Sequence, residues 1–389
     1  MWKVIALCFL AALFEGLDIQ SMGVAAPNVA PALGLDSRHM GIVLSASIFG
    51  LMIGAGWGGW ASDRYGRRNV LMLSLATFGF FSLLTSVAGS FASMVAVRVA
   101  TGVGLGGALP NIIALATDIA PARLRVTLLG IIYCGLPIGG ALAGAIAGFL
   151  DPGEWRHVFI VGGVGPLALV VLIGFIMPRD LPVRPATGAS PGGPSKRDGL
   201  LGERRMATLM LWIAYFFTLF AVYLLLNWLP TLMLAKGIER AVAPQAAIYL
   251  NGGAVIGSLI LGRLSDGRSM RAILLVTYAG MLVSLLFLAL ADRTLVMGAC
   301  FVAGFFIIGG QLVLYALAPA VYPPDLRGTG IGAAVAVGRI GSAAGPLLGG
   351  IVLAAGWGAG ATYLIAGPGL IAALVAALCL VHIDKRSLR

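Results

Sequence analysis

Long apolar segments alternate with short polar ones along the whole chain. A window of about 19 residues, suited to a helix that crosses a bilayer, finds 12 apolar segments. Their approximate ranges are 4–29, 38–58, 70–88, 92–116, 126–149, 157–177, 207–234, 242–262, 272–291, 295–318, 329–354 and 358–382. Most of them are long enough to cross about 30 Å of hydrocarbon at about 1.5 Å per helical residue. The pattern therefore predicts an all-α polytopic membrane protein with 12 transmembrane helices.

Composition excludes a soluble globular protein. Hydrophobic residues make up 59% of the chain and charged residues only 11%, whereas a soluble domain carries about 25% charged residues. Such a chain needs the lipid bilayer as its surroundings. Its first apolar segment is too long for a cleavable signal and contains two acids, so we expect it to be a span of the mature protein.

The net charge of +11 is distributed unevenly along the chain. The excess of Lys and Arg lies in the loops on one side, whereas acids and bases balance in the opposite loops and in the spans. This positive-inside pattern predicts that both termini are cytoplasmic, in the inner membrane of a bacterial-type cell. A nucleic-acid partner is not expected, because a basic patch for nucleic acid needs a soluble domain to carry it.

One polar segment, residues 179–206, divides the chain. It is rich in Pro, Gly, Ser and charge, which is typical of a flexible cytoplasmic linker. It separates an N-terminal six-helix bundle, residues 1–178, from a C-terminal six-helix bundle, residues 207–389. The two halves echo one another, since GWASD at residues 59–63 resembles GRLSD at residues 262–266. Repeats of six spans with a site at their interface are a transporter architecture.

Two motifs resemble those of the major facilitator superfamily. Residues 59–68 follow the pattern Gly-x-x-x-Asp-Arg-Tyr-Gly-Arg-Arg of its signature loop, and residues 98–107, Arg-x-x-x-Gly-Val-Gly-Leu-Gly-Gly, look like its second motif. The resemblance covers the whole chain and implies two pseudo-symmetric six-helix bundles that work by alternating access. The corresponding loop of the second half keeps Asp266 but lacks the Arg-x-Gly-Arg pattern.

Three stretches are similar to the aromatic acid:proton symporters within that superfamily. They are FEGLD at residues 14–18, NWLPTL at residues 227–232 and GRIG at residues 338–341. This resemblance implies a secondary active transporter that imports an aromatic monocarboxylate, of the 3-hydroxyphenylpropionate kind, together with H⁺. GLPIGG at residues 135–140 resembles a motif associated with antiporters, so a proton-coupled antiporter or exporter of aromatic or other small organic compounds is the alternative.

Four charged residues lie well inside the predicted spans, namely Glu15, Asp18, Arg98 and Arg339. Ionised groups in hydrocarbon cost a few kcal/mol each, so they face a cavity or one another and are functional by default. Glu15 and Asp18 are three residues apart and share one helix face. Burial and mutual repulsion favour protonated carboxyls, as a proton carrier requires. We predict proton coupling at Asp18 with Glu15 in support; a static ion pair between Asp18 and Arg98 is the alternative.

Both arginines are candidate ligands for a substrate anion. Arg98 can bind a carboxylate through two parallel hydrogen bonds, or it can pair with Asp18. If the substrate draws Arg98 away from Asp18, anion and proton load together. Arg339 has no acid within the spans of its own half, so a substrate carboxylate, backbone carbonyls and Asp18 all remain open as its partners.

An aromatic substrate needs flat apolar walls with a few polar groups. The candidate substrate-binding side chains, besides the arginines, are Tyr133, Tyr223, Asn227, Trp228, Gln311 and Tyr315. For the rings, core packing or lipid contact is at least as well supported. The amides are stronger candidates, because an amide within a span needs a partner.

A third group of residues lies near predicted span ends and is expected to control gating. Its members are Gly59, Asp63, Arg64, Gly66, Arg67, Arg68, Asp118, Arg125, Asp266, Asp325 and Arg327. Acids can cap helix N-termini, and arginines can bind helix C-termini or lipid phosphates. The alternative is that these charges only set the membrane topology. That would explain the arginines but not Asp63 or the spaced glycines.

Enzymatic chemistry is not expected. The histidines are scattered and form no metal-binding constellation, and no nucleotide-binding loop precedes a helix in the required context. The sequence therefore predicts no metal and no cofactor besides the coupling proton. The protein is expected to function as a monomer.

Overall fold

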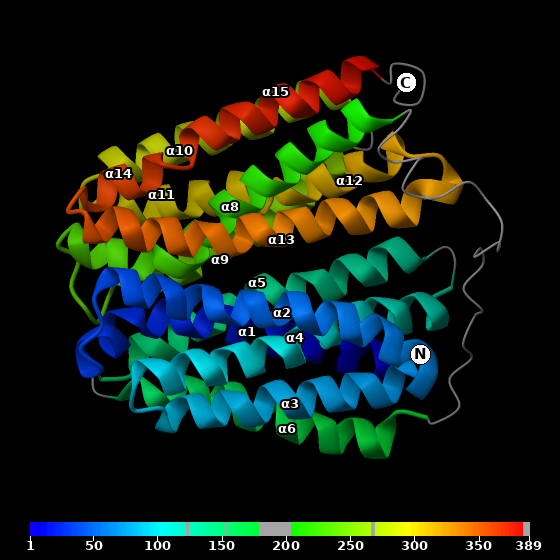
Figure 1. Ribbon diagram of the computed structural model, residues 1–389, viewed down its shortest axis with the longest axis horizontal. Coiled ribbons are helices and arrows are strands. Elements are labelled where there is room, and N and C mark those ends of the chain that lie inside the picture. Colours follow the sequence, from blue (N-terminus) through cyan, green and yellow to red (C-terminus); the bar gives the residue numbers. More distant parts are fainter. Residues whose placement is uncertain (122–123, 152–153, 179–203, 266–268, 384–389) are drawn as a thin grey trace. The chain divides into compact units, whose positions relative to one another are not determined.

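Every regular element that the structure describes is a helix (Figure 1). The computed structural model describes residues 1–121, 124–151, 154–178, 204–265 and 269–383. The helices are α1 (Trp2–Ala32), α2 (Ser37–Tyr65), α3 (Arg67–Val87), α4 (Phe91–Ile119), α5 (Arg125–Phe149), α6 (Arg156–Ile176), α8 (Arg205–Ala235), α9 (Gln245–Ser265), α10 (Met270–Leu290), α11 (Val296–Ala303), the π-helical turn η3 (Gly304–Ile308), α12 (Gln311–Val321), α13 (Pro324–Ala354), α14 (Gly358–Leu364) and α15 (Gly367–Ile383). Within the described residues, 12 helical stretches are long and apolar enough to cross a membrane. The predicted architecture is confirmed.

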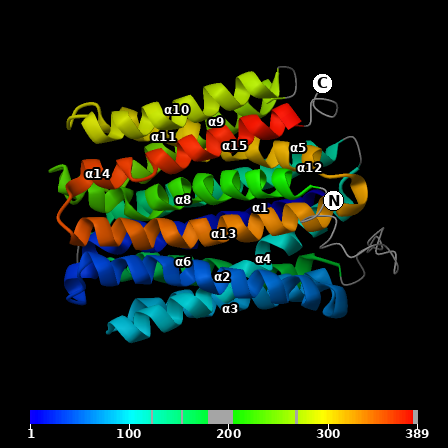
Figure 2. The same cartoon turned by 45° about the horizontal axis from the view of Figure 1, so that its top comes forward.

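The helices form two compact units. One comprises Met1–Arg184 with Leu226–Ile248, and the other comprises Pro185–Leu225 with Tyr249–Arg389, so the division falls within α8. In the second unit α10 lies beside α15, as Figures 1 and 2 both show. The predicted linker lies outside the described residues up to residue 203, and α8 begins at Arg205.

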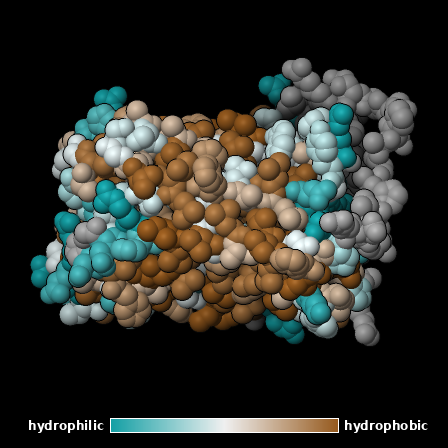
Figure 3. All heavy atoms as spheres, turned by 90° about the horizontal axis from the view of Figure 1, so that it is seen from below, coloured by the Kyte–Doolittle hydropathy of each residue, from teal (hydrophilic) through white to brown (hydrophobic). Residues whose placement is uncertain are grey.

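Apolar side chains cover the helix faces that turn outward. In Figure 3 they fill the middle of the visible face, and hydrophilic side chains gather toward its two ends. On α3 and α6 the exposed apolar residues include Phe80, at 52% exposure, and Phe175, at 86%. Such a band suits contact with lipid hydrocarbon between two aqueous boundaries.

Two of the predicted spans are interrupted. The span predicted at residues 295–318 is divided by η3, where the Gly309 amide donates to the Gly304 carbonyl five residues earlier, at 3.0 Å. The span predicted at residues 358–382 is divided between α14 and α15, and Pro368 lies at the start of α15. Proline has no amide proton to continue the preceding helix. Hydropathy could not reveal these breaks, because both segments are apolar throughout.

Glycine allows the helices of the first unit to pack backbone against backbone. A Cβ added to Gly102 on α4 would lie 1.9 Å from the Ser47 carbonyl oxygen on α2. A Cβ added to Gly139 on α5 would lie 1.9 Å from the Leu13 carbonyl oxygen on α1. Small residues at such positions are typical of helix packing in membranes. The contacts fix α1 and α4, the two helices that carry Asp18 and Arg98.

Candidate functional site

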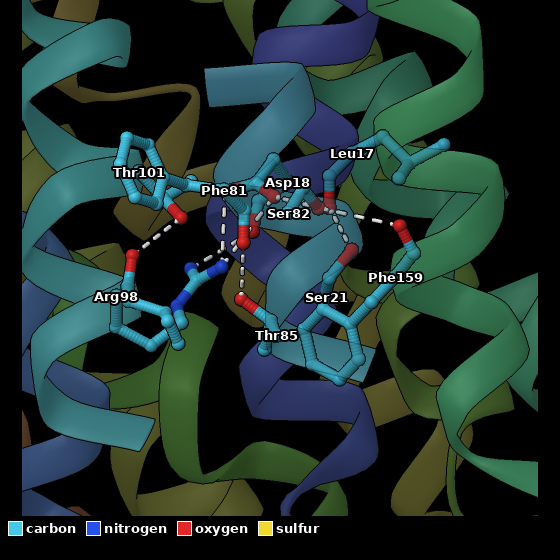
Figure 4. A network of polar contacts seen from close by, with 10 residues as sticks. Leu17, Asp18, Ser21, Phe81, Ser82, Thr85, Arg98, Thr101 and Phe159 are labelled. Carbon is cyan, nitrogen blue, oxygen red and sulfur yellow. Dashed lines mark hydrogen bonds and ion pairs between the residues drawn. The ribbon is translucent and has the colours of Figure 1, made fainter. Parts of the chain in front are cut away.

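A buried ion pair joins α1 and α4 in the first unit (Figure 4). Asp18 and Arg98 are both 0% exposed. The Arg98 Nη1 atom lies 3.2 Å from Asp18 Oδ2 and 3.4 Å from Oδ1, and Nη2 donates to the Asp18 backbone oxygen at 3.3 Å. The structure therefore brings together the two residues that the sequence singled out for proton coupling.

The pair lacks the parallel fork geometry that gives arginine its strongest carboxylate contacts. One guanidinium nitrogen reaches both carboxylate oxygens while the other reaches a backbone oxygen. Among the described residues, Arg98 Nε has no hydrogen-bond partner, although the guanidinium carbon lies 5.9 Å from the centroid of the Phe159 ring. A buried ion pair whose arginine keeps an unused hydrogen-bond donor is suited to an exchange in which Arg98 leaves Asp18 for another anion.

Glu15 lies one helical turn before Asp18 on α1 and is also buried, at 2% exposure. Two buried carboxyl groups therefore lie three residues apart on α1, a spacing that puts them on one helix face.

A second polar cluster lies in the other unit, around Arg339 on α13. Its Nη1 atom donates to the Tyr223 hydroxyl on α8 at 2.7 Å. On α12, the Gln311 amide donates to the Tyr315 hydroxyl, and the Tyr315 ring lies against that of Tyr215 with centroids 5.6 Å apart. Arg339 is partly accessible whereas Arg98 is fully buried. The cluster combines a cation, hydroxyls, an amide and flat rings.

The remaining substrate candidates belong to the first unit and not to the unit that holds the Arg339 cluster. Asn227 and Trp228 on α8 are buried, at 3% and 1% exposure, and Tyr133 on α5 is partly exposed.

Several gating candidates form a connected cluster at one end of the first unit. Arg67, at the start of α3, pairs with Asp118 at the end of α4 and donates to the Ala114 carbonyl at 3.0 Å. Arg68 donates to two carbonyls at the end of α6, that of Gly174 in the last turn and that of Met177 just after it, at 3.0 Å each. These contacts tie α3, α4 and α6 together.

The short connection between α2 and α3 depends on glycine. Gly66 has φ +84°, a conformation that other residues rarely adopt. The preceding Arg64 places its guanidinium carbon 5.8 Å from the Trp60 ring centroid and 5.7 Å from that of Tyr65. A Cβ at Gly59 would meet no described atom within 4 Å.

Among the other gating candidates, Arg327 is exposed. Asp266 and the side chains of Asp63, Arg125 and Asp325 lie outside the described part of the structure.

Sequence reasoning missed two buried polar residues, one of which contacts the charged pair. Ser82 on α3 donates to Asp18 Oδ1 at 2.8 Å and is 0% exposed. Gln20 on α1 is 5% exposed, and its amide lies over Gly140, where an added Cβ would be 1.8 Å from Nε2. Serine is ordinary in membrane helices, so only Gln20, as a buried amide, carried a signal in the sequence.

The helical architecture and the buried charges define a multi-pass membrane transporter. The chain belongs to the Major Facilitator Superfamily, whose sequence model matches residues 8–346 and 246–389. This membership makes it a transporter and not an enzyme. It also confirms the resemblance that the motifs indicate.

Named relatives agree with this membership. The chain is 46% identical to the 3-(3-hydroxy-phenyl)propionate transporter of Escherichia coli (strain K12) over 98% of this chain and 94% of that one. It is 35% identical to the gallate transporter of Pseudomonas putida over 99% and 93% of the two chains. Among solved structures, the xylose transporter XylE of E. coli in an inward-open conformation matches with a TM-score of 0.77 and 15% identity, over 96% of this chain and 95% of that one. That likeness shows the fold.

Proposed function

We propose that the protein imports an aromatic monocarboxylate together with a proton by alternating access. The observation that carries this proposal is the fully buried pair of Asp18 and Arg98, a titratable acid held by a cation inside a membrane span. The relatives named above transport 3-(3-hydroxyphenyl)propionate and gallate, which supports a hydroxylated aromatic acid as the substrate.

The charged pair provides a route for coupling. A carboxylate that loses a neighbouring cation binds a proton more readily. When a substrate anion draws Arg98 toward itself, Asp18 takes up a proton, and anion and proton cross together. The imperfect geometry of the pair, with contacts of 3.2 Å and 3.4 Å, favours such an exchange. Glu15, buried one turn away, supports the proton path.

The Arg339 cluster supplies the chemistry for holding the substrate. Arg339 is the more accessible of the two intramembrane arginines, and with the Tyr223 hydroxyl it can bind a carboxylate. Gln311 and Tyr315 offer hydrogen bonds to a ring hydroxyl, and Tyr215 lies against Tyr315 as an aromatic wall.

Import of one anion with one proton is electroneutral, so the pH gradient drives it. Each pH unit is then worth about 1.4 kcal/mol per proton. We further propose two six-helix bundles, residues 1–178 and 207–389, joined by a cytoplasmic linker. We also propose that the protein works as a monomer in a bacterial inner membrane. The positive-inside pattern supports a cytoplasmic location for both termini.

The decisive test is Asp18→Asn in proteoliposomes. The amide keeps the size of the side chain but cannot carry a proton. We expect concentrative uptake of labelled 3-(3-hydroxyphenyl)propionate under an imposed pH gradient to fall to the equilibration level, while substrate exchange across the membrane persists. Asp292→Asn, the same change in an exposed loop, is the matched control. Undiminished proton-driven accumulation in Asp18→Asn would refute the proposal.

Proton-coupled export is the second candidate, and GLPIGG at residues 135–140 favours it. In the structure Gly139 contacts the backbone of α1, the helix that carries Asp18. The direction of the response separates the two functions. A protonophore should abolish accumulation of the labelled acid in cells if the protein is a symporter, and should increase accumulation if it is an exporter.

A further inference from the structure

One hydroxyl group connects three helices beside the ion pair. Ser82 on α3 donates to Asp18 Oδ1 on α1 at 2.8 Å, and its oxygen also lies 3.4 Å from the Phe159 carbonyl oxygen on α6 (Figure 4). Ser82, Asp18 and Phe159 are all 0% exposed.

A serine hydroxyl has one proton to donate and two lone pairs that accept. It cannot donate to Asp18 and to the Phe159 carbonyl at once. The distance to Asp18 is normal for a hydroxyl that donates to a carboxylate, whereas 3.4 Å is long. In this structure the proton therefore points to Asp18, and the Phe159 carbonyl is the second acceptor within reach.

Ser82 makes the shorter contact with the Asp18 carboxylate. Its 2.8 Å compares with 3.2 Å and 3.4 Å from Arg98 Nη1. Arg98 supplies the countercharge, but the hydroxyl supplies the better-formed hydrogen bond.

The packing around Ser82 leaves room for the hydroxyl. Gly162 on α6 faces it, and a Cβ added there would lie 3.3 Å from Ser82 Oγ. At the next residue, a Cβ on Gly163 would lie 2.6 Å from the carbonyl oxygen of Gly79, about one turn before Ser82 on α3. This close approach of α3 and α6 is what brings the Phe159 carbonyl within reach of Ser82.

We propose that Ser82 is a positioning residue whose hydroxyl changes partner with the protonation state of Asp18. This inference rests on the proposed proton symport. While Asp18 is ionised, Ser82 donates to it and holds the carboxylate beside Arg98. When Asp18 takes up a proton, the Ser82 hydroxyl turns its own proton to the Phe159 carbonyl and accepts the hydrogen bond from the new carboxyl group.

Few other charges face Asp18 from the helices packed around it. On α1 the neighbouring titratable group is Glu15, and on α4 it is Arg98. The charged residues of α2, α3, α5 and α6 lie at the ends of those helices in the sequence. Around the ion pair, α3 contributes the Ser82 hydroxyl and α6 contributes the ring of Phe159. Removal of the hydroxyl therefore changes one contact to Asp18 without removing a charge.

The test is the pH profile of transport in Ser82→Ala. Initial uptake of labelled 3-(3-hydroxyphenyl)propionate into proteoliposomes is measured over a range of external pH at fixed internal pH. Without the hydroxyl the ionised carboxylate loses a charge-assisted hydrogen bond, whereas the protonated carboxyl loses only a weaker neutral one. We expect the external pH of half-maximal uptake to rise by about one pH unit, the equivalent of the difference between those two hydrogen bonds.

Ser86→Ala is the matched control. Ser86 lies one turn further along α3, is 7% exposed and donates only within its own helix, to the Leu83 carbonyl at 2.6 Å. Its profile should coincide with that of the unaltered protein. Ser82→Cys, with nearly the same volume and a weaker donor, should show a smaller shift in the same direction, and it provides the readout if Ser82→Ala is not recovered folded.

The outcomes separate the two proposals. A lower maximal rate in Ser82→Ala with an unmoved midpoint, or a midpoint moved to lower pH, overturns the role of Ser82 and leaves proton symport intact. If the unaltered protein shows no uptake driven by the pH gradient, proton symport fails and the role of Ser82 fails with it.

Discussion

The intramembrane charges divide into two environments. Asp18 and Arg98 are sealed in the interior of the first unit and bind each other. Arg339, in the second unit, is partly accessible and shares a hydrogen bond with the Tyr223 hydroxyl. Arg98 is a buried cation that already has an anion, which suits coupling. Arg339 is an accessible cation beside a phenol, which suits anion binding.

The anion-binding role of Arg339 predicts the effect of Arg339→Lys. Lysine keeps the charge but loses the planar fork that binds a carboxylate with two hydrogen bonds. We expect the KM for 3-(3-hydroxyphenyl)propionate to rise about tenfold, which corresponds to about 1.4 kcal/mol. Exposed Arg293, changed to Lys, is the control. A reduced maximal rate with unchanged KM would point to a structural role for Arg339 instead.

The sequence identified the charged residues because charge is rare in a membrane span. It offered Asp18 as a partner for both Arg98 and Arg339 and could not choose between them, since hydropathy carries no information on contacts between helices, and Asp18 and Arg98 are 80 positions apart. Ser82 was missed for a different reason. A serine in a span is inexpensive and common, so its importance depends on the carboxylate that it faces.

At the scale of elements, hydropathy predicted the helices well. The predicted start of the first span, residue 4, and its end, residue 29, compare with Trp2–Ala32 for α1. The differences lie at the ends, where the helix extends a few residues beyond the predicted apolar segment. Hydropathy measures the apolar stretch and not the hydrogen-bonded helix.

The close packing of α2 on α4 predicts that Gly102→Ala is destabilising. The added Cβ would lie 1.9 Å from the Ser47 carbonyl oxygen, which belongs to a backbone that cannot move aside freely. We expect the midpoint of thermal unfolding in detergent to fall, with a cost of about 1–3 kcal/mol. Gly56→Ala on α2 is the control, because nothing described lies within 4 Å of its added Cβ. Equal unfolding midpoints for the two variants would contradict the packing.

The N-terminus of α2 predicts a pH-dependent contribution to stability. The His39 backbone amide donates to the Asp36 carboxylate at 2.7 Å, and this bond, with that from the His39 ring, holds the pKa of Asp36 below its usual range. A lowered pKa in the folded state means that the stabilisation is present above the ordinary value of about 3.9 and is lost as the pH falls through the folded value.

Asp36→Ala should therefore unfold at a lower temperature than the unaltered protein at neutral pH. The difference should shrink as the pH is lowered through the acid range, because the protonated carboxyl no longer caps the helix. Asp36→Asn, which caps without titrating, should keep most of the stability at neutral pH. A difference that stays constant with pH would show that the carboxylate charge is irrelevant.

At the scale of the whole molecule, charge predicts orientation. The excess of positive charge lies in loops that the hydropathy pattern assigns to one side. Because Lys and Arg are retained on the cytoplasmic side of membranes, we predict that both termini are cytoplasmic. This inference needed only the order of spans and loops, so it could be made without any contact between helices.

The orientation predicts which loops react with a reagent that does not cross the membrane. In a background without the four native cysteines, Arg293→Cys, between α10 and α11, should be labelled by a charged maleimide in intact cells. Ser269→Cys, before α10, should be labelled only after permeabilisation. The reverse pattern would place the termini outside the cytoplasm.

The π-helical turn at Gly304–Ile308 sets the rotational phase of the segment that follows it. Each α-helical residue turns the chain by about 100°, and a π turn accommodates one residue more than an α turn. The side chains of α12 are consequently rotated about the helix axis by about 100° relative to an uninterrupted α-helix. This rotation determines the direction in which Gln311 and Tyr315 point. A single-residue deletion within the turn would leave the span apolar and continuous while it turned the polar face of α12 away from its present neighbours. The polar face of this span is therefore governed by residue count as much as by residue identity.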